Sequence, residues 1–233
     1  MNLTGLTQLN LSSNQVSDLT PLSGLTNLGY LWLDGNQADN LTPLSSLSNL
    51  TYLHVNSNQI SDLAPLSGLT GLTHLFLDGN QISDLGPLSG LTSLSMLSLG
   101  RNQISNLSSL CGLTSLTHLY LGNNQISDLL PLAGLTDLTI LDLQSNQISD
   151  ISPLSGLTGL KRLWLDANRI SNLSPLSDLT SLVELGLAHN DINDIEPLVN
   201  NVGLGTGDAV GLSFNPLSST SVLQHIPLLQ ARG

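Results

Sequence analysis

The stretch Leu138–Gly159, LTILDLQSNQISDISPLSGLTG, recurs almost letter for letter along the chain with a period of 22 residues. One asparagine marks the period, and its copies are Asn14, Asn36, Asn58, Asn80, Asn102, Asn124, Asn146, Asn168 and Asn190. A fixed period of this length is typical of a solenoid, in which each repeat packs only against its neighbours. We therefore expect one continuous stack of coils rather than a compact globule.

Within each copy, the spacing L-x-x-L-x-L-x-x-N resembles the signature of leucine-rich repeats. Nine copies begin at Leu6, Leu28, Leu50, Leu72, Leu94, Leu116, Leu138, Leu160 and Leu182. The first nine residues of a copy predict a short strand, in which Leu141 and Leu143 point inward while Ile140 and Asp142 point outward. The strands should be parallel, because the same crossover leads from each strand to the next.

The second half of each copy predicts a turn and a short helical segment. The repeated asparagine can both donate to and accept from backbone groups that the turn leaves unpaired, so stacked copies should form an asparagine ladder. Asp150, which precedes Ile151, Ser152 and Pro153, is predicted to cap a helix with proline in its first turn. Only about five residues, PLSGL, are available there, which favours a 3₁₀ turn. The predicted class is an α/β, right-handed leucine-rich-repeat solenoid with a parallel sheet on the concave face and short 3₁₀ or helical turns on the convex face.

The two ends of the stack are expected to differ. Residues 1–215 should form the solenoid, including a final coil whose Asn215 follows Asn190 by 25 residues, and residues 216–233 should form a C-terminal cap. In that cap, Ser219 to His225 predicts a short capped helix stopped by Pro227. The apolar residues expected to cover the open core are Val222, Leu223, Ile226, Leu228 and Leu229.

No comparable segment precedes the first copy, which predicts that Leu9 and Leu11 are partly exposed and favour weak self-association. The chain begins inside a repeat, so we expect it to be an excerpt of a longer protein.

Composition excludes several classes of protein. The formal net charge is −12, whereas nucleic-acid binding needs a basic surface. A single cysteine, Cys111, excludes internal disulfides. No apolar run approaches the roughly 18 residues of a membrane span, and the first residues lack the pattern of a signal peptide, so no membrane insertion is expected.

The unit N-Q-I-S-D-L-x-P-L-x-x-L-T resembles the 22-residue repeats of bacterial internalins and their relatives, and similar repeats occur in a eukaryotic regulatory subunit of protein phosphatase 1. The resemblance covers essentially the whole chain. It implies the solenoid fold and a secreted or cell-surface bacterial parent that contacts another protein. It is more specific for fold than for function, because repeat proteins keep their frame and change their ligands.

Aromatic side chains gather at two outward positions of the predicted strands. The chain has seven Trp, Tyr and Phe residues, and six of them fall at these positions. The seventh, Phe214, is expected on the last strand. Because neighbouring strands lie about 4.8 Å apart, Trp32, His54 and Phe76 should form one aromatic stripe, with further rings beside it. Aromatics also favour strands for packing alone, but none lies on the convex turns, which favours a binding role.

The predicted function is a non-catalytic module that binds a protein partner through the concave sheet. Trp32, Phe76, Tyr120 and Trp164 are the expected anchors. The full set of predicted binding residues is Tyr30, Trp32, Tyr52, His54, His74, Phe76, Met96, His118, Tyr120, Asp142, Arg162, Trp164, Asp166 and Glu184. Carbohydrate binding on the same stripe and a structural spacer in a larger surface protein are the alternatives.

No catalytic residue, metal site or cofactor is predicted. His74 and His118 lie two strands apart, roughly 10 Å along the sheet, without a third ligand of suitable geometry. Asp142 and Asp166 are placed on an open sheet rather than in a cleft that would tune their pKa values. No histidine is placed to activate Cys111.

Overall fold

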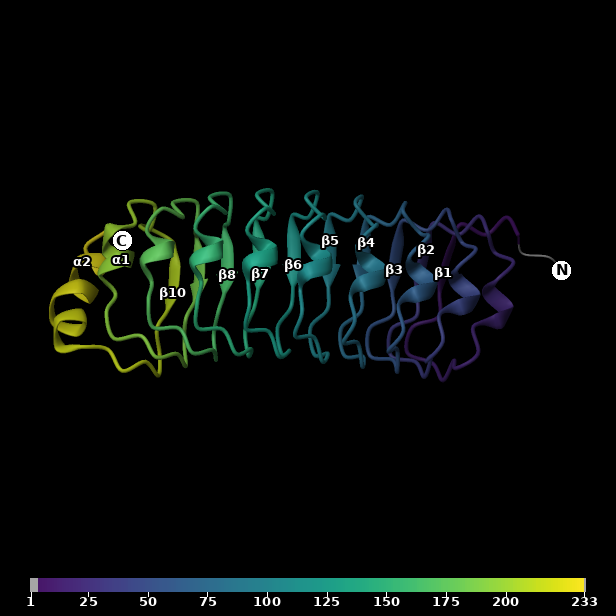
Figure 1. The fold of residues 1–233 in the computed structure, drawn as a ribbon, viewed down its shortest axis with the longest axis horizontal. Helices are drawn as coiled ribbons and strands as arrows, with labels where there is room; N and C mark the ends of the chain where they lie inside the picture. Colours follow the sequence, from purple (N-terminus) through teal and green to yellow (C-terminus); the bar gives the residue numbers. More distant parts are fainter. Residues whose placement is uncertain (1–3, 233) are drawn as a thin grey trace.

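The computed structural model describes residues 4–232, and these form one elongated stack of coils (Figure 1). Ten three-residue strands pair in chain order into a single parallel sheet. They are β1 (Gln8–Asn10), β2 (Tyr30–Trp32), β3 (Tyr52–His54), β4 (His74–Phe76), β5 (Met96–Ser98), β6 (His118–Tyr120), β7 (Ile140–Asp142), β8 (Arg162–Trp164), β9 (Glu184–Gly186) and β10 (Ala209–Gly211). The predicted fold class is confirmed.

The strands follow the alternation that the sequence predicts. Pairing keeps equivalent residues in line, so that Leu141 pairs with Leu163 and Asp142 with Trp164. Leu141 and Leu143 are fully buried, whereas Ile140 and Asp142 on either side of Leu141 are half-buried and face outward. We call the surface of the sheet that is turned away from this leucine core the sheet face.

The repeated asparagine forms hydrogen bonds with the backbone groups that the turn at the end of each strand leaves unpaired. The Nδ2 group of Asn80 donates to the carbonyls of Val55 and Leu77 at 2.9 and 3.0 Å, and its Oδ1 accepts from the N–H of Ile60 at 2.9 Å. Each asparagine therefore links two successive coils through the backbone, as the predicted ladder requires. The residue before it has a positive φ, for example 53° at Ser57 and 66° at Gly79.

The other side of each coil carries a short 3₁₀ turn. These turns are η1 (Thr20–Leu22), η2 (Thr42–Leu44), η3 (Ala64–Leu66), η4 (Gly86–Leu88), η5 (Ser108–Leu110), η6 (Leu130–Leu132), η7 (Ser152–Leu154) and η8 (Ser174–Leu176). Pro153 lies in the first turn of η7, as predicted. The residue at the cap position of η7 is Ile151, however, so the assignment of Asp150 to that position is wrong. Asp150 lies one residue earlier, and its Oδ1 accepts from the N–H of Ser152 at 2.8 Å, which is the Asx-turn arrangement.

The last coil departs from the regular frame. It contains α1 (Glu196–Asn200) and β10, and the chain ends in a π-helical turn, η9 (Ser221–His225), that continues into α2 (Ile226–Gln230). The prediction that Pro227 stops the helix is wrong, because Pro227 lies in the first turn of α2. In the preceding turn the Ile226 N–H donates to the Ser221 carbonyl five residues back. Such a widened turn accommodates proline, which cannot donate and would crowd a regular helix.

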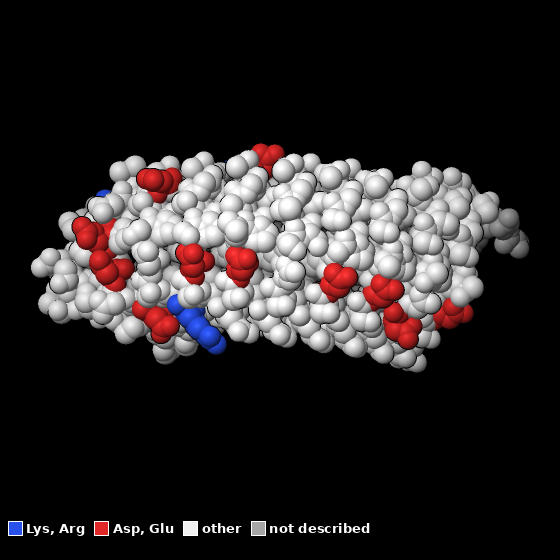
Figure 2. Space-filling view, viewed as in Figure 1, with Lys and Arg blue, Asp and Glu red and all other residues white. Residues whose placement is uncertain are grey.

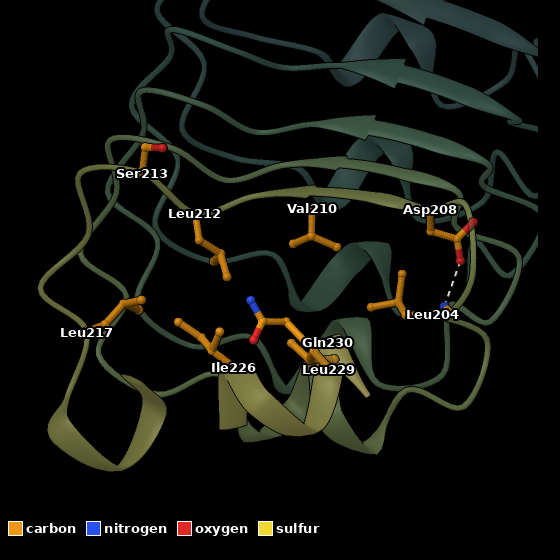
Figure 3. Close-up of a pocket in the computed structure, with 10 residues that line it drawn as sticks. Leu204, Asp208, Val210, Leu212, Ser213, Leu217, Ile226, Leu229 and Gln230 are labelled. Carbon is orange, nitrogen blue, oxygen red and sulfur yellow. Dashed lines mark hydrogen bonds between the residues drawn. The ribbon is translucent and has the colours of Figure 1, made fainter. Parts of the chain in front are cut away.

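Only part of the expected apolar set of the C-terminal segment reaches the core. Ile226 and Leu229 pack against it, whereas Val222, Leu223 and Leu228 are 47, 74 and 52% exposed. Figure 3 shows that Ile226 and Leu229 face Val210 and Leu212 of the last coil. Between them lies an open pocket of about 510 Å³. The segment therefore covers the last coil incompletely.

Phe214 is not on the last strand, contrary to the prediction. It occupies the turn after β10 with a φ of 58°, is 76% exposed, and stacks on His189 with ring centroids 4.1 Å apart. At the opposite end of the stack, Leu6, Leu9 and Leu11 are only half-buried. Among residues 4–232, no helix is long and apolar enough to cross a membrane.

Candidate recognition surface on the sheet

The structure places all the predicted binding residues on or beside the sheet face. The first and third residues of the strands supply every one of them except Asp166, which lies two residues after Trp164 and just beyond β8. Asp166 belongs to a third line of outward residues that follows the strands: Asp34, Asn56, Asp78, Gly100, Gly122, Gln144, Asp166 and Ala188. Apart from Asp166, the sequence-based prediction missed this line.

Six rings over β2 to β4 form one contiguous group, which we call the aromatic cluster: Tyr30, Trp32, Tyr52, His54, His74 and Phe76. Ring centroids of neighbours lie between 4.0 Å, for His54 and Phe76, and 6.4 Å, for Trp32 and His54. The cluster arises because the in-register strands bring equivalent positions together. Tyr30, at its edge, is 41% exposed.

His54 is oriented by a carboxylate that the sequence-based prediction did not include. Its Nδ1 lies 3.2 Å from Oδ2 of Asp34, while Asp34 Oδ1 accepts from the N–H of Asn56 at 2.8 Å. The His54 Nε2 atom is buried and has no hydrogen-bond partner within residues 4–232. An imidazole that donates its Nδ1–H to Asp34 fits this arrangement.

The other two histidines of the sheet face are held by the threonines that precede them. Thr73 Oγ1 lies 2.9 Å from His74 Nδ1, and Thr117 Oγ1 lies 2.8 Å from His118 Nδ1. Burial, and to a smaller extent the nearby His74, lower the pKa of His118. The neutral form of His118 is therefore favoured at physiological pH. In the part of the chain that is described, no group of three or more His, Cys, Asp or Glu side chains is placed to hold a metal ion.

A polar depression lies next to the aromatic cluster, over β5 and β6. We call it the sheet hollow, and its volume is about 300 Å³. Its lining residues are Asp78, Ser98, Gly100, Arg101, Tyr120, Gly122, Asn123, Asp142 and Gln144. Burial raises the pKa of Tyr120 and that of Asp142, and for Asp142 the charges of Asp166 and Asp78 act in the same direction. Of these residues, only Tyr120 and Asp142 were predicted from the sequence.

Over β8 and β9, the polar and charged side chains of the sheet face bind one another. The Trp164 Nε1–H donates to Glu184 Oε1 at 2.9 Å, and Arg162 Nε lies 3.3 Å from Glu184 Oε2. Both partners of the ion pair remain about half exposed, so the pair contributes little to stability. Asp166 points elsewhere, and its Oδ1 accepts from the N–H of Ala188 at 2.8 Å.

Away from the sheet face, the surface is acidic. The side of the molecule drawn in Figure 2 shows many Asp and Glu side chains and few Lys or Arg. This agrees with the 17 acidic and 5 basic residues of the chain. A partner approaching the molecule therefore meets a predominantly negative potential.

Comparison with known proteins places the chain in a family. The model for paired leucine-rich repeats matches residues 4–46, 48–90, 92–134, 136–178 and 158–200. Internalin C2 of Listeria monocytogenes is 42% identical, with a TM-score of 0.76 over 77% of this chain and 80% of that one. An internalin of the same species, inlF, is 32% identical, with a TM-score of 0.65 over 92% of this chain and 76% of that one.

A plant protein extends the structural likeness beyond bacteria. The ectodomain of the Arabidopsis thaliana receptor kinase GASSHO1/SCHENGEN3, solved in complex with CASPARIAN STRIP INTEGRITY FACTOR 2, is 26% identical. Its TM-score is 0.79 over 93% of this chain and 28% of that one. Comparison with curated protein sequences gives no match. The repeats, the sheet and these likenesses show that the chain belongs to the leucine-rich-repeat family, in its bacterial internalin-like class.

Proposed function

We propose that this chain is a non-catalytic recognition module that binds a protein partner through its sheet face. The observation that carries the proposal is the position of the aromatic residues. Six of the seven Trp, Tyr and Phe side chains lie on that face, and four of them join two histidines in the aromatic cluster. Partly exposed Trp and Tyr side chains in a contiguous patch are the usual anchors of protein interfaces.

Strand packing alone accounts less well for this distribution. β5 carries Met96 and Ser98 at the same two positions, and β7 carries Ile140 and Asp142. Both strands keep the same pairing as the aromatic strands. Since the sheet forms without rings at these positions, ring stacking is dispensable for the fold, and a role for the cluster in binding is favoured.

The family supports recognition of proteins in general. Leucine-rich-repeat proteins act as protein-interaction modules, and the plant receptor ectodomain that resembles this chain is in complex with another factor. The internalin likeness favours a secreted or cell-surface bacterial parent, in which such a module would contact a protein outside the cell.

The test is a pull-down from cell-surface extracts with immobilised wild-type protein and the variant Trp32→Ala/Tyr52→Ala/Phe76→Ala. Leu130→Ala is the matched control, because Leu130 is a large apolar residue on η6, away from the sheet, and is 68% exposed. We expect the wild type and the control to retain a protein that the triple variant loses, with all three chains folded by circular dichroism.

Two other outcomes contradict the proposal. Retention of the same material by all three chains would identify the cluster as strand packing and favour the spacer alternative. Retention that disappears after enzymatic removal of glycans, and that persists at high salt, would favour carbohydrate binding.

A further inference from the structure

The sheet hollow exists because two glycines succeed each other in the third outward line. Gly100 and Gly122 occupy equivalent positions after β5 and β6, where neighbouring coils carry Asp78 and Gln144. Because these two positions have no side chains, their backbone is exposed in the hollow. The side chains of the other lining residues surround it. It lies in the middle of the proposed binding face, between the aromatic cluster and Trp164.

Two carboxylates enter the hollow from opposite sides. The N–H of Gly100 donates to Asp78 Oδ1 at 2.8 Å. A Cβ atom added at Gly100 would lie 2.7 Å from Asp78 Oδ1, and one added at Gly122 would lie 2.9 Å from Asp142 Oδ2. The two glycines thus leave the space into which the carboxylates lean. Because the glycines lie on adjacent coils, the two carboxylates are no more than roughly 10 Å apart.

The negative charge in the hollow has no partner in the described part of the chain. Asp78 and Asp142 form no ion pair there, and Arg101, the one basic residue lining the hollow, lies beyond ion-pair distance of both. The Asp142 carboxylate accepts hydrogen bonds from Gln144 alone. The Gln144 N–H donates to it at 2.9 Å, and Gln144 Nε2 donates at 3.2 Å.

Ser98 supplies a third polar side chain. It is only 6% exposed and lines the hollow, and within residues 4–232 its hydroxyl forms no hydrogen bond. The hydroxyl oxygen itself is not sealed from solvent, so it is free to bond to a group that enters the hollow. The hollow therefore presents two carboxylates, a hydroxyl and one aromatic wall, Tyr120, to whatever enters it.

We propose that the sheet hollow is the subsite for an arginine side chain of the protein partner, an inference that rests on the proposed function. A guanidinium is planar and carries five N–H donors in a fixed fork, so one edge can bind one of the two carboxylates while the remaining donors stay available to the other polar groups of the hollow. Its face can stack on the ring of Tyr120. A lysine ammonium is a point charge and cannot bind a carboxylate bidentately while stacking. The net charge of −12 would attract a basic partner before contact.

The experiment is a titration of ¹⁵N-labelled protein with N-acetyl-arginine amide, followed by NMR. N-acetyl-lysine amide tests charge alone, and N-acetyl-citrulline amide tests a neutral side chain of the same shape. We expect saturable shifts of the Gly100, Gly122 and Ser98 amide signals with arginine, and binding at least about tenfold weaker with the other two. Equal affinity for lysine or citrulline, or shifts that are spread over the molecule without saturation, would overturn the proposal.

Three variants sharpen the test. Asp78→Asn/Asp142→Asn removes the charges, and Gly122→Asn fills the floor with the side chain that the same line carries at Asn56. Both are expected to abolish the arginine-specific shifts. Asp128→Asn, which removes a carboxylate beside η6, should leave them unchanged. Unaltered arginine binding in both hollow variants would contradict the assignment.

The probe requires no partner, so this titration and the pull-down fail independently. If the wild type does not bind the arginine probe, the proposed subsite is wrong, but the aromatic cluster is still a candidate interface. If the wild type retains no protein in the pull-down, the titration can still show that the sheet hollow binds arginine.

Discussion

At the scale of single residues, neighbours in sequence have opposite roles because a strand alternates its side chains. Leu119 is fully buried, whereas Tyr120, the next residue, is half-buried on the sheet face. The first belongs to the leucine core, and the second belongs to the wall of the sheet hollow. Substitutions at the two positions should therefore separate stability from binding.

We expect Leu119→Ala to lower the free energy of unfolding by about 2–5 kcal/mol, because it leaves a cavity in a close-packed core. Tyr120→Ala should change it much less, since its ring already contacts solvent. Urea unfolding followed by circular dichroism measures both. Similar losses at the two positions would show that Tyr120 is part of the core packing, which the alternation forbids.

Asp142 gives a prediction on pH. Burial raises its pKa above the ordinary 3.8, against the lowering effect of the hydrogen bonds from Gln144, and the neighbouring charges of Asp166 and Asp78 add to the rise. Above the raised pKa the carboxylate is charged in both the folded and the unfolded chain, and the folded chain bears the cost of burying it. Below 3.8 it is protonated in both states. Asp142→Asn should therefore stabilise the protein near neutral pH, and this gain should disappear as the pH falls through the raised pKa towards 3.8.

The measurement is urea unfolding of the wild type and the variant over a series of pH values. The control is Asp150→Asn. The pKa of Asp150 is lowered by hydrogen bonds from Ser152, so its charged form is favoured in the folded chain, and its replacement should give no gain at neutral pH. A gain for Asp142→Asn that persists unchanged below pH 3.8 would exclude the buried charge as its cause.

The residues of the candidate site could be predicted only where the same outward position carries a distinctive side chain in several coils. The outward positions of Trp32 and Phe76 follow from alternation, and the structure places both as expected. The sheet hollow was missed, because it is formed by what Gly100 and Gly122 lack. A glycine in a turn ordinarily indicates backbone freedom, and only the neighbouring coils show that a carboxylate uses the space.

At the scale of the elements, the regular coils were predictable and the last coil was not. Each strand, asparagine turn and 3₁₀ turn recurs often enough for its pattern to be read by comparison within the chain. The segment after Asn215 occurs once, so single-residue rules had to decide it. The rule that proline ends a helix failed at Pro227, because the π turn before it widens the backbone.

We propose that residues 216–233 act as the cap of the stack, and their removal tests this. Without them the apolar residues of the last coil that line the C-terminal pocket, Val210 and Leu212, lose the cover of Ile226 and Leu229. We expect the truncated chain to aggregate, as measured by light scattering during gel filtration. Leu223→Ser/Leu228→Ser, at exposed positions of the same segment, should leave the chain monomeric. A well-behaved truncated monomer would contradict a capping role.

At the scale of the whole molecule, stability is expected to vary along the stack, because each coil contacts only its neighbours. Leu28, Leu31 and Leu33 of the second coil are fully buried, whereas Leu9 and Leu11 of the first coil are only half-buried. This difference cannot be read from the repeat pattern, which is the same in both coils. It arises from position, since within residues 4–232 the first coil contacts a neighbouring coil on one side only.

Amide hydrogen exchange can measure this gradient with equivalent hydrogen bonds as internal standards. The N–H groups of Leu11, Leu121 and Leu187 each donate to a carbonyl of the following coil at 2.8 Å. Differences in their exchange therefore report how often a coil opens rather than the geometry of the bond. We expect Leu11 to exchange fastest and Leu121 slowest, with Leu187 protected as long as residues 216–233 are present. Equal exchange at Leu11 and Leu121 would mean that the coils open together, and the open N-terminal end would then carry no local weakness.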